Sequence, residues 1–493
     1  MHHSGSMTAS IPADSRSKIA WILIPAIVMS LGWGLRGYIG GGPFGAMIPG
    51  ALVTLIICRY LGCNERSAAN VVVFGAFGVG FGGLMTYGQT LGLLRADETL
   101  AWGLTGTTLK GGVWGLLGGA VIGLGLAARH IPQRKLGWAF LFLLAGVIVG
   151  IHEINATKLV YFSDPVNKPR DESWAGLLIG ALALLGYVRL AAPNLFWIPG
   201  WFAVYGLVGG AIGFGAGSLF NATQSRVSDT WRWMPFWKYM EFSFGLAFGA
   251  ALGLCALHLR DRLAALVNAD DDDSQVQGVF DDNAESRGLA LVAGVLLVYG
   301  VFAELRLFIE VVIPRLRDLP ATNVGRTVVE AVMGFTGLGC LVMWLSTWWR
   351  NLAWQAAISV TITAAAIDWQ RDLLPRGDID MPEIWRTAYI VGMAGASILF
   401  VHVWQRRANP RLMSLFLFAT CVLMAIGYQM GLGMSGIWWP NPDDVAAAGS
   451  RGAYLLQKFR SELIVHAIFT TLFVISVVAG VVERRREATS TST

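Results

Sequence analysis

A lone arginine stands in a stretch rich in helix-breaking residues. Arg36 lies in LGWGLRGYIGGGPFGAMIPG, residues 31–50, among many glycines and two prolines. These residues interrupt helices, and non-helical backbone at membrane depth is tolerated only inside protein or beside a water-filled cavity. A guanidinium beside free backbone amides suits a carboxylate, phosphate or sulfate. The segment is therefore either an anion-binding break in a helix or a tight outer turn with Arg36 at the interface.

Two further charges begin apolar segments. Lys110 opens the apolar stretch 106–128, and Glu241 opens the stretch 241–259 after a tryptophan-rich loop, DTWRWMPFWKY, that contains Trp237. Charged side chains inside a membrane segment are expensive and often functional. We expect Lys110 and Glu241 to form a buried pair that binds substrate together with Arg36 and Trp237, around a water-accessible cavity that reaches mid-membrane. Two separate interfacial charges are the alternative.

Histidines next to carboxylates provide candidates for proton coupling. Glu462 and His466 are four residues apart on one helix face, and His152 and Glu153 end the apolar stretch 136–155. Adjacent helical residues point about 100° apart, so we expect His152 and Glu153 not to share a site easily. A polar interfacial end is the other interpretation of this pair. Glu153, Glu462 and His466 are the proton-coupling candidates.

Other charged residues have local explanations. Arg306 with Glu310, and Arg326 with Glu330, are spaced to neutralise each other on a helix. The outer loop 368–386 contains four Asp, one Glu and three Arg; it either supplies acid–base groups or is a solvated, salt-bridged loop. Loop tryptophans indicate an interfacial aromatic belt or a stacking platform for sugars or isoprenoid chains: Trp231, Trp233, Trp237, Trp438 and Trp439.

Several motifs are missing from the sequence. GxxxxGK[ST], HExxH, GxSxG, CxxC and CxxCH do not occur. We therefore expect no nucleotide-binding loop, no metal, no cofactor and no assigned catalytic residue. No basic run with interleaved aromatic residues suggests a nucleic-acid partner.

The composition identifies the setting in which these residues act. The residues AVILMFWYC make up 55% of the 493 positions, charged residues only 14%, and the mean hydropathy is +0.55. Soluble domains have about 25% charged residues. These values predict an all-α, polytopic transmembrane helical bundle.

About fourteen stretches (13–14) are long enough to span a bilayer, which takes about 20 residues each. They lie near 19–35, 40–62, 70–94, 106–128, 136–155, 174–192, 197–219, 241–259, 287–313, 327–348, 351–368, 386–405, 411–431 and 462–482. With both termini inside (N-in/C-in), the inner loops are short and basic, and the tail carries Arg484, Arg485 and Arg486. The positive-inside rule favours this orientation and a multi-pass protein of the bacterial inner membrane.

Glycine separates two parts of the chain. Of the 60 glycines, 42 precede residue 261. One row, Gly111, Gly115, Gly119 and Gly123, and another, Gly245, Gly249 and Gly253, have the four-residue spacing of closely packed membrane helices. The segment GLLGGAVIGL from Gly115 matches GLAFGAALGL from Gly245 at six of ten positions, 130 residues apart, and Gly75, Gly78 and Gly82 match Gly206, Gly209 and Gly213 at 131.

The offsets predict a tandem 4+4 helix repeat, 19–130 and 136–260, unless Gly/Ala/Leu-rich segments match by chance. The expected organisation is a polar tail (1–18), a glycine-rich eight-helix part (19–260), an acidic cytoplasmic linker (261–286), a six-helix part (287–482) and a basic tail (483–493).

The leading functional expectation is a transporter or flippase for a polar, anionic solute or lipid-linked molecule, driven by protons. Its partners would be membrane lipid and that small-molecule or lipid-linked substrate. The alternatives are an integral membrane transferase or hydrolase with an extracytoplasmic site, built from loops 221–240, 368–386 and 432–461, and a structural subunit of a membrane complex.

Overall fold

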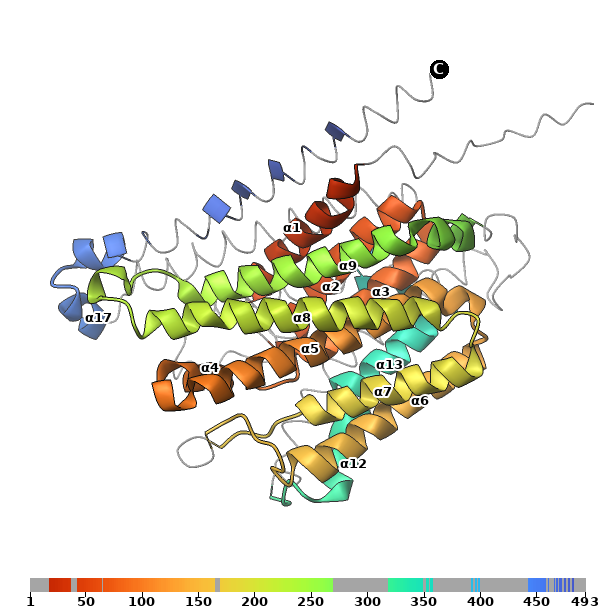
Figure 1. The fold of residues 1–493 in the computed structure, drawn as a ribbon, viewed down its shortest axis with the longest axis horizontal. Helices are drawn as coiled ribbons and strands as arrows, with labels where there is room; N and C mark the ends of the chain where they lie inside the picture. Colours follow the sequence, from red (N-terminus) through yellow and green to blue (C-terminus); the bar gives the residue numbers. More distant parts are fainter. Residues whose placement is uncertain are drawn as a thin grey trace, which may run out of the picture.

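The computed structural model describes residues 17–36, 42–63, 65–164, 169–268, 318–348 and 442–457, with single positions between 352 and 482. All regular elements in these residues are helices, which agrees with the predicted fold class (Figure 1). The acidic stretch 269–286, the expected spans 287–313 and 411–431, and the loop 368–386 lie outside the described residues, as do Arg306, Glu310, Trp438 and Trp439.

Eight long helices form the described bundle. They are α1 (Lys18–Arg36), α2 (Gly42–Leu61), α3 (Glu65–Gly82), α5 (Asp97–Ala127), α6 (Gln133–Gly150), α7 (Trp174–Ala191), α8 (Trp197–Gln224) and α9 (Phe236–Asn268). Shorter elements are α4 (Gly88–Gly92), η4 (Ile151–Asn155), α12 (Val324–Val332), α13 (Phe335–Ser346) and α17 (Pro442–Ala447).

Eight helical segments are long and apolar enough to cross a membrane: 18–36, 42–61, 97–130, 133–155, 174–191, 197–224, 236–267 and 324–346. They correspond to eight of the fourteen expected spans. The third expected span, 70–94, is wrong in its bounds, since α3 ends at Gly82 and residues 88–92 form the separate α4. The total span count, the orientation and the six-helix part stay predictions.

Helix α5 is the centre of the bundle, and its glycine row allows close packing. A Cβ atom at Gly115 would overlap the carbonyl oxygen of Gly206, and one at Gly111 would overlap that of Gly210. The backbones of α5 and α8 therefore touch each other directly. This is the packing that small residues four apart predict for membrane helices.

The second glycine row packs against α1. A Cβ at Gly245 would lie 2.7 Å from the carbonyl oxygen of Met29, and one at Gly249 would overlap that of Pro25. The row thus brings α9 against α1. The two rows resemble each other in sequence, yet they meet different neighbours.

One pair of contacts is repeated along the chain. Gly78 of α3 faces Val121 of α5, and Gly209 of α8 faces Ala251 of α9. These positions match at offsets of 131 and 130, the offsets of the sequence similarity. The helix pairs α3–α5 and α8–α9 therefore share this glycine contact, whereas duplication of whole four-helix units stays a prediction.

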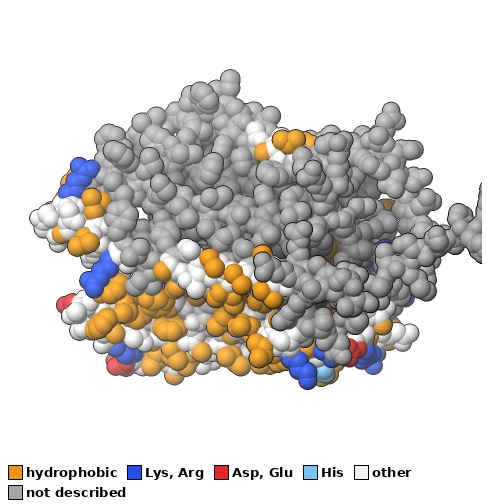
Figure 2. Space-filling view, turned by 90° about the horizontal axis from the view of Figure 1, so that it is seen from above, with side chains coloured by type: hydrophobic (Ala, Val, Ile, Leu, Met, Phe, Trp, Pro, Cys, Tyr) orange, Lys and Arg blue, Asp and Glu red, His pale blue; other side chains and the backbone are white. Residues whose placement is uncertain are grey.

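The described surface has the polarity of a protein in lipid. In Figure 2, apolar side chains fill the middle of the described face, and charged side chains gather towards its two ends. Helix α8 contributes exposed apolar side chains along its length: Trp201, Val204, Val208, Ile212 and Leu219. An apolar band between charged ends is what a bilayer requires.

The glycine contacts predict a contrast between two alanine variants. Gly115→Ala should lower the free energy of unfolding by about 1–3 kcal/mol, since the new methyl group has no space. Gly186→Ala is the matched control, because its Cβ would meet nothing within 4 Å; it should be neutral or stabilise by up to about 1 kcal/mol. SDS-induced unfolding followed by tryptophan fluorescence measures both. Equal stability of the two variants would contradict the backbone contact between α5 and α8.

Candidate functional site

Arg36 is the last residue of α1 and is only 2% exposed. Its Nη1 donates a hydrogen bond to the hydroxyl of Tyr87. The guanidinium carbon lies 5.0 Å from the ring centres of Tyr87 and Trp114 and 5.7 Å from that of Trp33. Three aromatic rings thus surround the guanidinium and stabilise it through cation–π attraction.

The guanidinium has no anionic partner within the described part of the chain. No carboxylate lies within ion-pair distance of Arg36, and its buried Nε donates no hydrogen bond. A buried charge is costly unless it is paired and hydrogen-bonded, and the cation–π contacts, each worth about 2 kcal/mol when desolvated, stabilise the guanidinium without neutralising it. Within the described residues, the guanidinium therefore lacks a negatively charged partner, and its Nε–H group lacks an acceptor.

The side chain of Arg36 is buried among aromatic rings at the end of α1. Helices α1 and α2 are separate, and residues 37–41 between them lie outside the described residues. The depth of Arg36 in the membrane, and the choice between a broken helix and an outer turn, stay predictions. The anion-binding role of Arg36 stays a hypothesis.

Glu241 lies in the second turn of α9, since the helix begins at Phe236 and not at Glu241 as expected. The carboxylate is 1% exposed. It accepts hydrogen bonds from the indole of Trp237 at 2.9 Å and from the ammonium of Lys238 at 2.7 Å. Lys238 also donates to the carbonyl of Gly34, two residues before Arg36. Lys238 of α9 thus contacts the end of α1.

Tyr87 links the environments of Arg36 and Glu241. Its ring centre lies 6.1 Å from that of Trp237 and 5.5 Å from that of Phe214. Since its hydroxyl accepts the bond from Arg36, the tyrosine lies between the guanidinium and the indole that binds Glu241. Helices α1, α5, α8 and α9 all contribute aromatic rings to this cluster.

Lys110 lies 13 residues into α5, about 20 Å along the helix, and does not open the span as predicted. Its partner is Glu172, with the ammonium 2.8 Å from Oε1, and both side chains are 1% exposed. The ammonium also donates to the carbonyl of Thr86 and to the hydroxyl of Thr90. The expected Lys110–Glu241 pair is therefore wrong: each charge has another partner.

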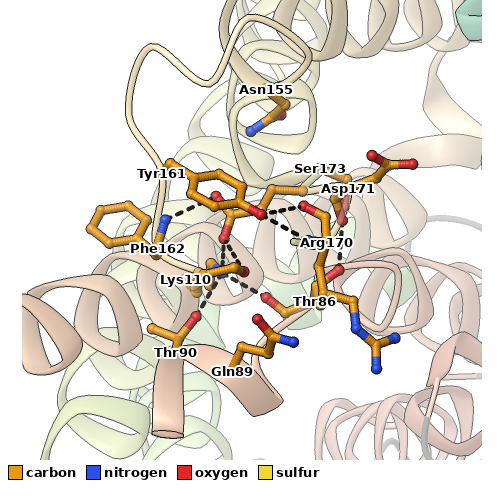
Figure 3. Close-up of polar contacts among 12 residues, drawn as sticks. Thr86, Gln89, Thr90, Lys110, Asn155, Tyr161, Phe162, Arg170, Asp171 and Ser173 are labelled. Atoms are coloured by element: carbon orange, nitrogen blue, oxygen red, sulfur yellow. Dashed lines mark hydrogen bonds and ion pairs between the residues drawn. The ribbon is translucent and has the colours of Figure 1, made fainter. Parts of the chain in front are cut away.

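This ion pair anchors the connection between η4 and α7, and Figure 3 shows Lys110 beside Tyr161 and Phe162 of that connection. Glu172 also accepts hydrogen bonds from the Ser163 hydroxyl at 3.0 Å and the Phe162 backbone amide at 3.2 Å. Lys110 donates three hydrogen bonds and Glu172 accepts three, one of which is the bond between them. This pair is a structural support for residues 86–90, which carry Tyr87.

Within the described residues, Arg36, Lys110 and Glu241 do not line an open cavity, since their side chains are 2%, 1% and 1% exposed. Aromatic rings pack around the guanidinium of Arg36 instead. The three residues do share one buried region, because segment 86–90 contacts Arg36 through Tyr87 and Lys110 through Thr86 and Thr90.

His152 and Glu153 contact each other, contrary to expectation. The imidazole Nδ1 lies 2.8 Å from Oε1 of Glu153, and its Nε2 lies 3.1 Å from the carbonyl oxygen of Thr322. Residues 151–155 form a wider π-helical turn, which departs from the 100° spacing of an α-helix. The Glu153 side chain is 66% exposed, and Glu462 and His466 lie outside the described residues.

The local pair Arg326–Glu330 is confirmed, with Nε 2.9 Å from the carboxylate. Arg326 also reaches Asp171 at 3.1 Å. These contacts hold α12 against the segment before α7. They give Arg326 and Glu330 a structural role.

A surface pocket, separate from the groups above, lies at the end of the bundle where α8 and α9 are connected. It has a volume of about 570 Å³ and is lined by two segments: Asp229, Arg232 and Trp233 from the α8–α9 connection, and Leu456, Gln457 and Arg460. Figure 1 shows α17 beside the α8–α9 connection. The two lining segments belong to two of the three loops that the enzyme hypothesis names.

Sequence reasoning missed the groups that define the buried site. Tyr87, Trp33 and Trp114 are aromatic residues in apolar stretches, and their positions alone do not distinguish them from packing residues. Glu172 lies in a polar stretch, PRDESW, where acidic residues are usually solvated. Only its position between two expected spans, at the same end as Lys110, could have indicated a pairing.

Comparison of the chain with known protein families, with curated proteins and with solved structures finds no match.

The Lys110–Glu172 pair predicts a coupled stability effect. Lys110→Met and Glu172→Leu should each cost about 3–5 kcal/mol, because each leaves one buried charge without its partner. The double variant should cost less than the sum, since neither charge remains. Asp97→Asn is the control, because its side chain is 87% exposed in its pair with Arg226 and should change little. If the losses of unfolding free energy in the two single variants simply add up in the double variant, the two charges do not stabilise each other.

Proposed function

We propose that the protein is a multi-pass membrane transporter or flippase for a polar, anionic solute or lipid-linked molecule. One observation carries the proposal: the 2%-exposed guanidinium of Arg36 has no carboxylate partner within the described residues. Intramembrane charges are expensive and mark substrate or ion pathways. A bound anion would supply the missing charge.

The geometry supports recognition of an oxyanion. Nη1 of Arg36 is bound to Tyr87, whereas the buried Nε is free to donate. A carboxylate, phosphate or sulfate accepts such charge-assisted bonds strongly, most of all in low dielectric. The aromatic rings on its faces keep the guanidinium in place and direct its remaining donors to its edge.

The described conformation is closed in this proposal. Because Arg36, Lys110 and Glu241 are shielded from water, the anion must enter through a rearrangement, as alternating access requires. Glu241 and Lys238 form a neighbouring ion pair beside the end of α1. A proton on Glu241 would release Lys238 towards an anion, which is how proton coupling would act here. The bacterial inner membrane is the proposed location.

The second candidate is a transferase or hydrolase that acts at the membrane surface. The pocket between residues 229–233 and 456–460 favours it, because the structure brings together two of the expected loops. Its lining contains a single carboxylate, Asp229, which is paired with Arg232 at 2.8 Å. Acid–base chemistry usually uses a pair of titratable groups, so transport has the stronger support.

Transport can be tested on Arg36 directly. Proteoliposomes should take up at least one anion of a panel of phosphate, sulfate and succinate, or should flip fluorescent phosphatidylglycerol between leaflets. Arg36→Gln should reduce that rate at least tenfold, since charge-assisted bonds are worth about 1.5–3 kcal/mol. Arg36→Lys should restore part of it, because the charge returns without the planar fork.

Arg226→Gln is the control, as this arginine is partly exposed and paired with Asp97; its rate should stay at the wild-type level. Uptake and flipping that Arg36→Gln leaves unchanged, in a variant that folds normally, would rule out the role assigned to Arg36. Turnover of a lipid phosphate ester by the purified protein would favour the enzyme instead.

A further inference from the structure

The pocket at the end of α8 and α9 is separate from the buried site around Arg36. Its lining comes from the α8–α9 connection and from residues 453–460, and it includes neither Arg36 nor Tyr87. The volume of about 570 Å³ falls in the range of small-molecule sites. It is a second place where the chain can hold a ligand.

The charges of the pocket are mainly cationic. Arg232 and Arg460 contribute two guanidiniums, and Asp229 contributes the one carboxylate of the lining. Asp229 is 2.8 Å from Arg232 and compensates one of the two positive charges. The positive charge of Arg460 is not compensated by a carboxylate of the lining, so it can attract an anion.

Trp233 gives Arg460 a defined position. The guanidinium carbon of Arg460 lies 4.3 Å from the ring centre of Trp233. A guanidinium stacked on an indole keeps its N–H donors at the edge, where they can reach a phosphate. Gln457 adds an amide donor on the same wall.

The remaining lining is apolar, and its location suits a lipid. Leu456 is 71% exposed, and Trp231 beside the pocket is 50% exposed. The pocket also lies where two candidate spans, Trp197–Gln224 and Phe236–Val267, leave the apolar layer. Aromatic and basic residues at this depth meet phosphate headgroups above and acyl chains below.

We propose that this pocket binds the phosphate headgroup of an anionic phospholipid, with Arg460 and Arg232 on the phosphate and Leu456 against an acyl chain. The site is independent of the transport role assigned to Arg36. It would hold lipid at one end of the bundle whatever the protein carries. A free phosphate ester shares the headgroup chemistry but lacks the chain that Leu456 would contact.

The test is a titration of the full chain in detergent micelles with dioctanoyl phosphatidylglycerol, followed by tryptophan fluorescence. The wild type should show saturable binding, and dioctanoyl phosphatidylcholine, which is zwitterionic, should bind at least tenfold more weakly. The double variant Arg232→Gln/Arg460→Gln should lose at least tenfold in affinity for phosphatidylglycerol. Leu456→Ser should also weaken binding of that lipid.

Arg95→Gln is the matched control. Arg95 is an exposed arginine at the same end of the bundle, where its carbonyl accepts a hydrogen bond from Ser225, and its loss should leave lipid affinity unchanged. Thermal unfolding without lipid should be alike in all variants, because the substituted side chains are exposed.

Two results would overturn the proposal. One is an unchanged phosphatidylglycerol affinity in the double variant. The other is inorganic phosphate or glycerol phosphate binding as tightly as the lipid and displacing it, which would assign the pocket to a soluble phosphate. If Arg36→Gln abolishes anion transport but leaves lipid binding intact, the lipid site is still supported. The two proposals can therefore be contradicted independently.

Discussion

The close approach of helix backbones at the glycine rows determines the rest of this structure. Glycine contacts bring α8 against α5, and α1 against α9. In lipid, association of helices depends on packing and hydrogen bonding, since the surrounding tails are as apolar as the side chains. Side chains larger than hydrogen at Gly115 or Gly249 would separate these helices. The end of α1, where Arg36 lies, would then lose contact with the aromatic residues of its neighbours.

This packing explains why the buried charges divide into two kinds. Lys110 and Glu172 neutralise each other and have a full set of hydrogen bonds, so they act as a support. Arg36 has rings on its faces and a tyrosine hydroxyl, but no negative partner within the described chain. Stability alone would favour an apolar residue in its place. Under the proposed function, a bound anion supplies the negative charge that the described fold does not.

Composition and periodicity predicted the class of fold because lipid imposes simple rules. Long apolar segments must be helices in a bilayer, and small residues four apart must pack closely, as Gly115 and Gly245 do. Partners of charged residues were harder to predict. Lys110 and Glu241 both begin apolar stretches, which predicts a pair, whereas the actual partner of Lys110, Glu172, comes from a connection whose path depends on tertiary packing. The predicted helix starts were also too late in the sequence. Helix α5, for example, begins with polar residues at Asp97, before the apolar stretch 106–128.

A sequence indicates polarity but not volume, so the space around Arg36 could not be predicted from it. Glycine-rich helices leave gaps only where no large side chain fills them. Here the Trp114 ring fills the space beside Gly82, and Trp33 lies beside Gly245. The rings exclude water, and exclusion of water strengthens any bond from the guanidinium to an anion. In the transport proposal, a closed aromatic cluster would bind a dehydrated anion more strongly than a wide aqueous cavity, and helices would have to move before the anion could leave.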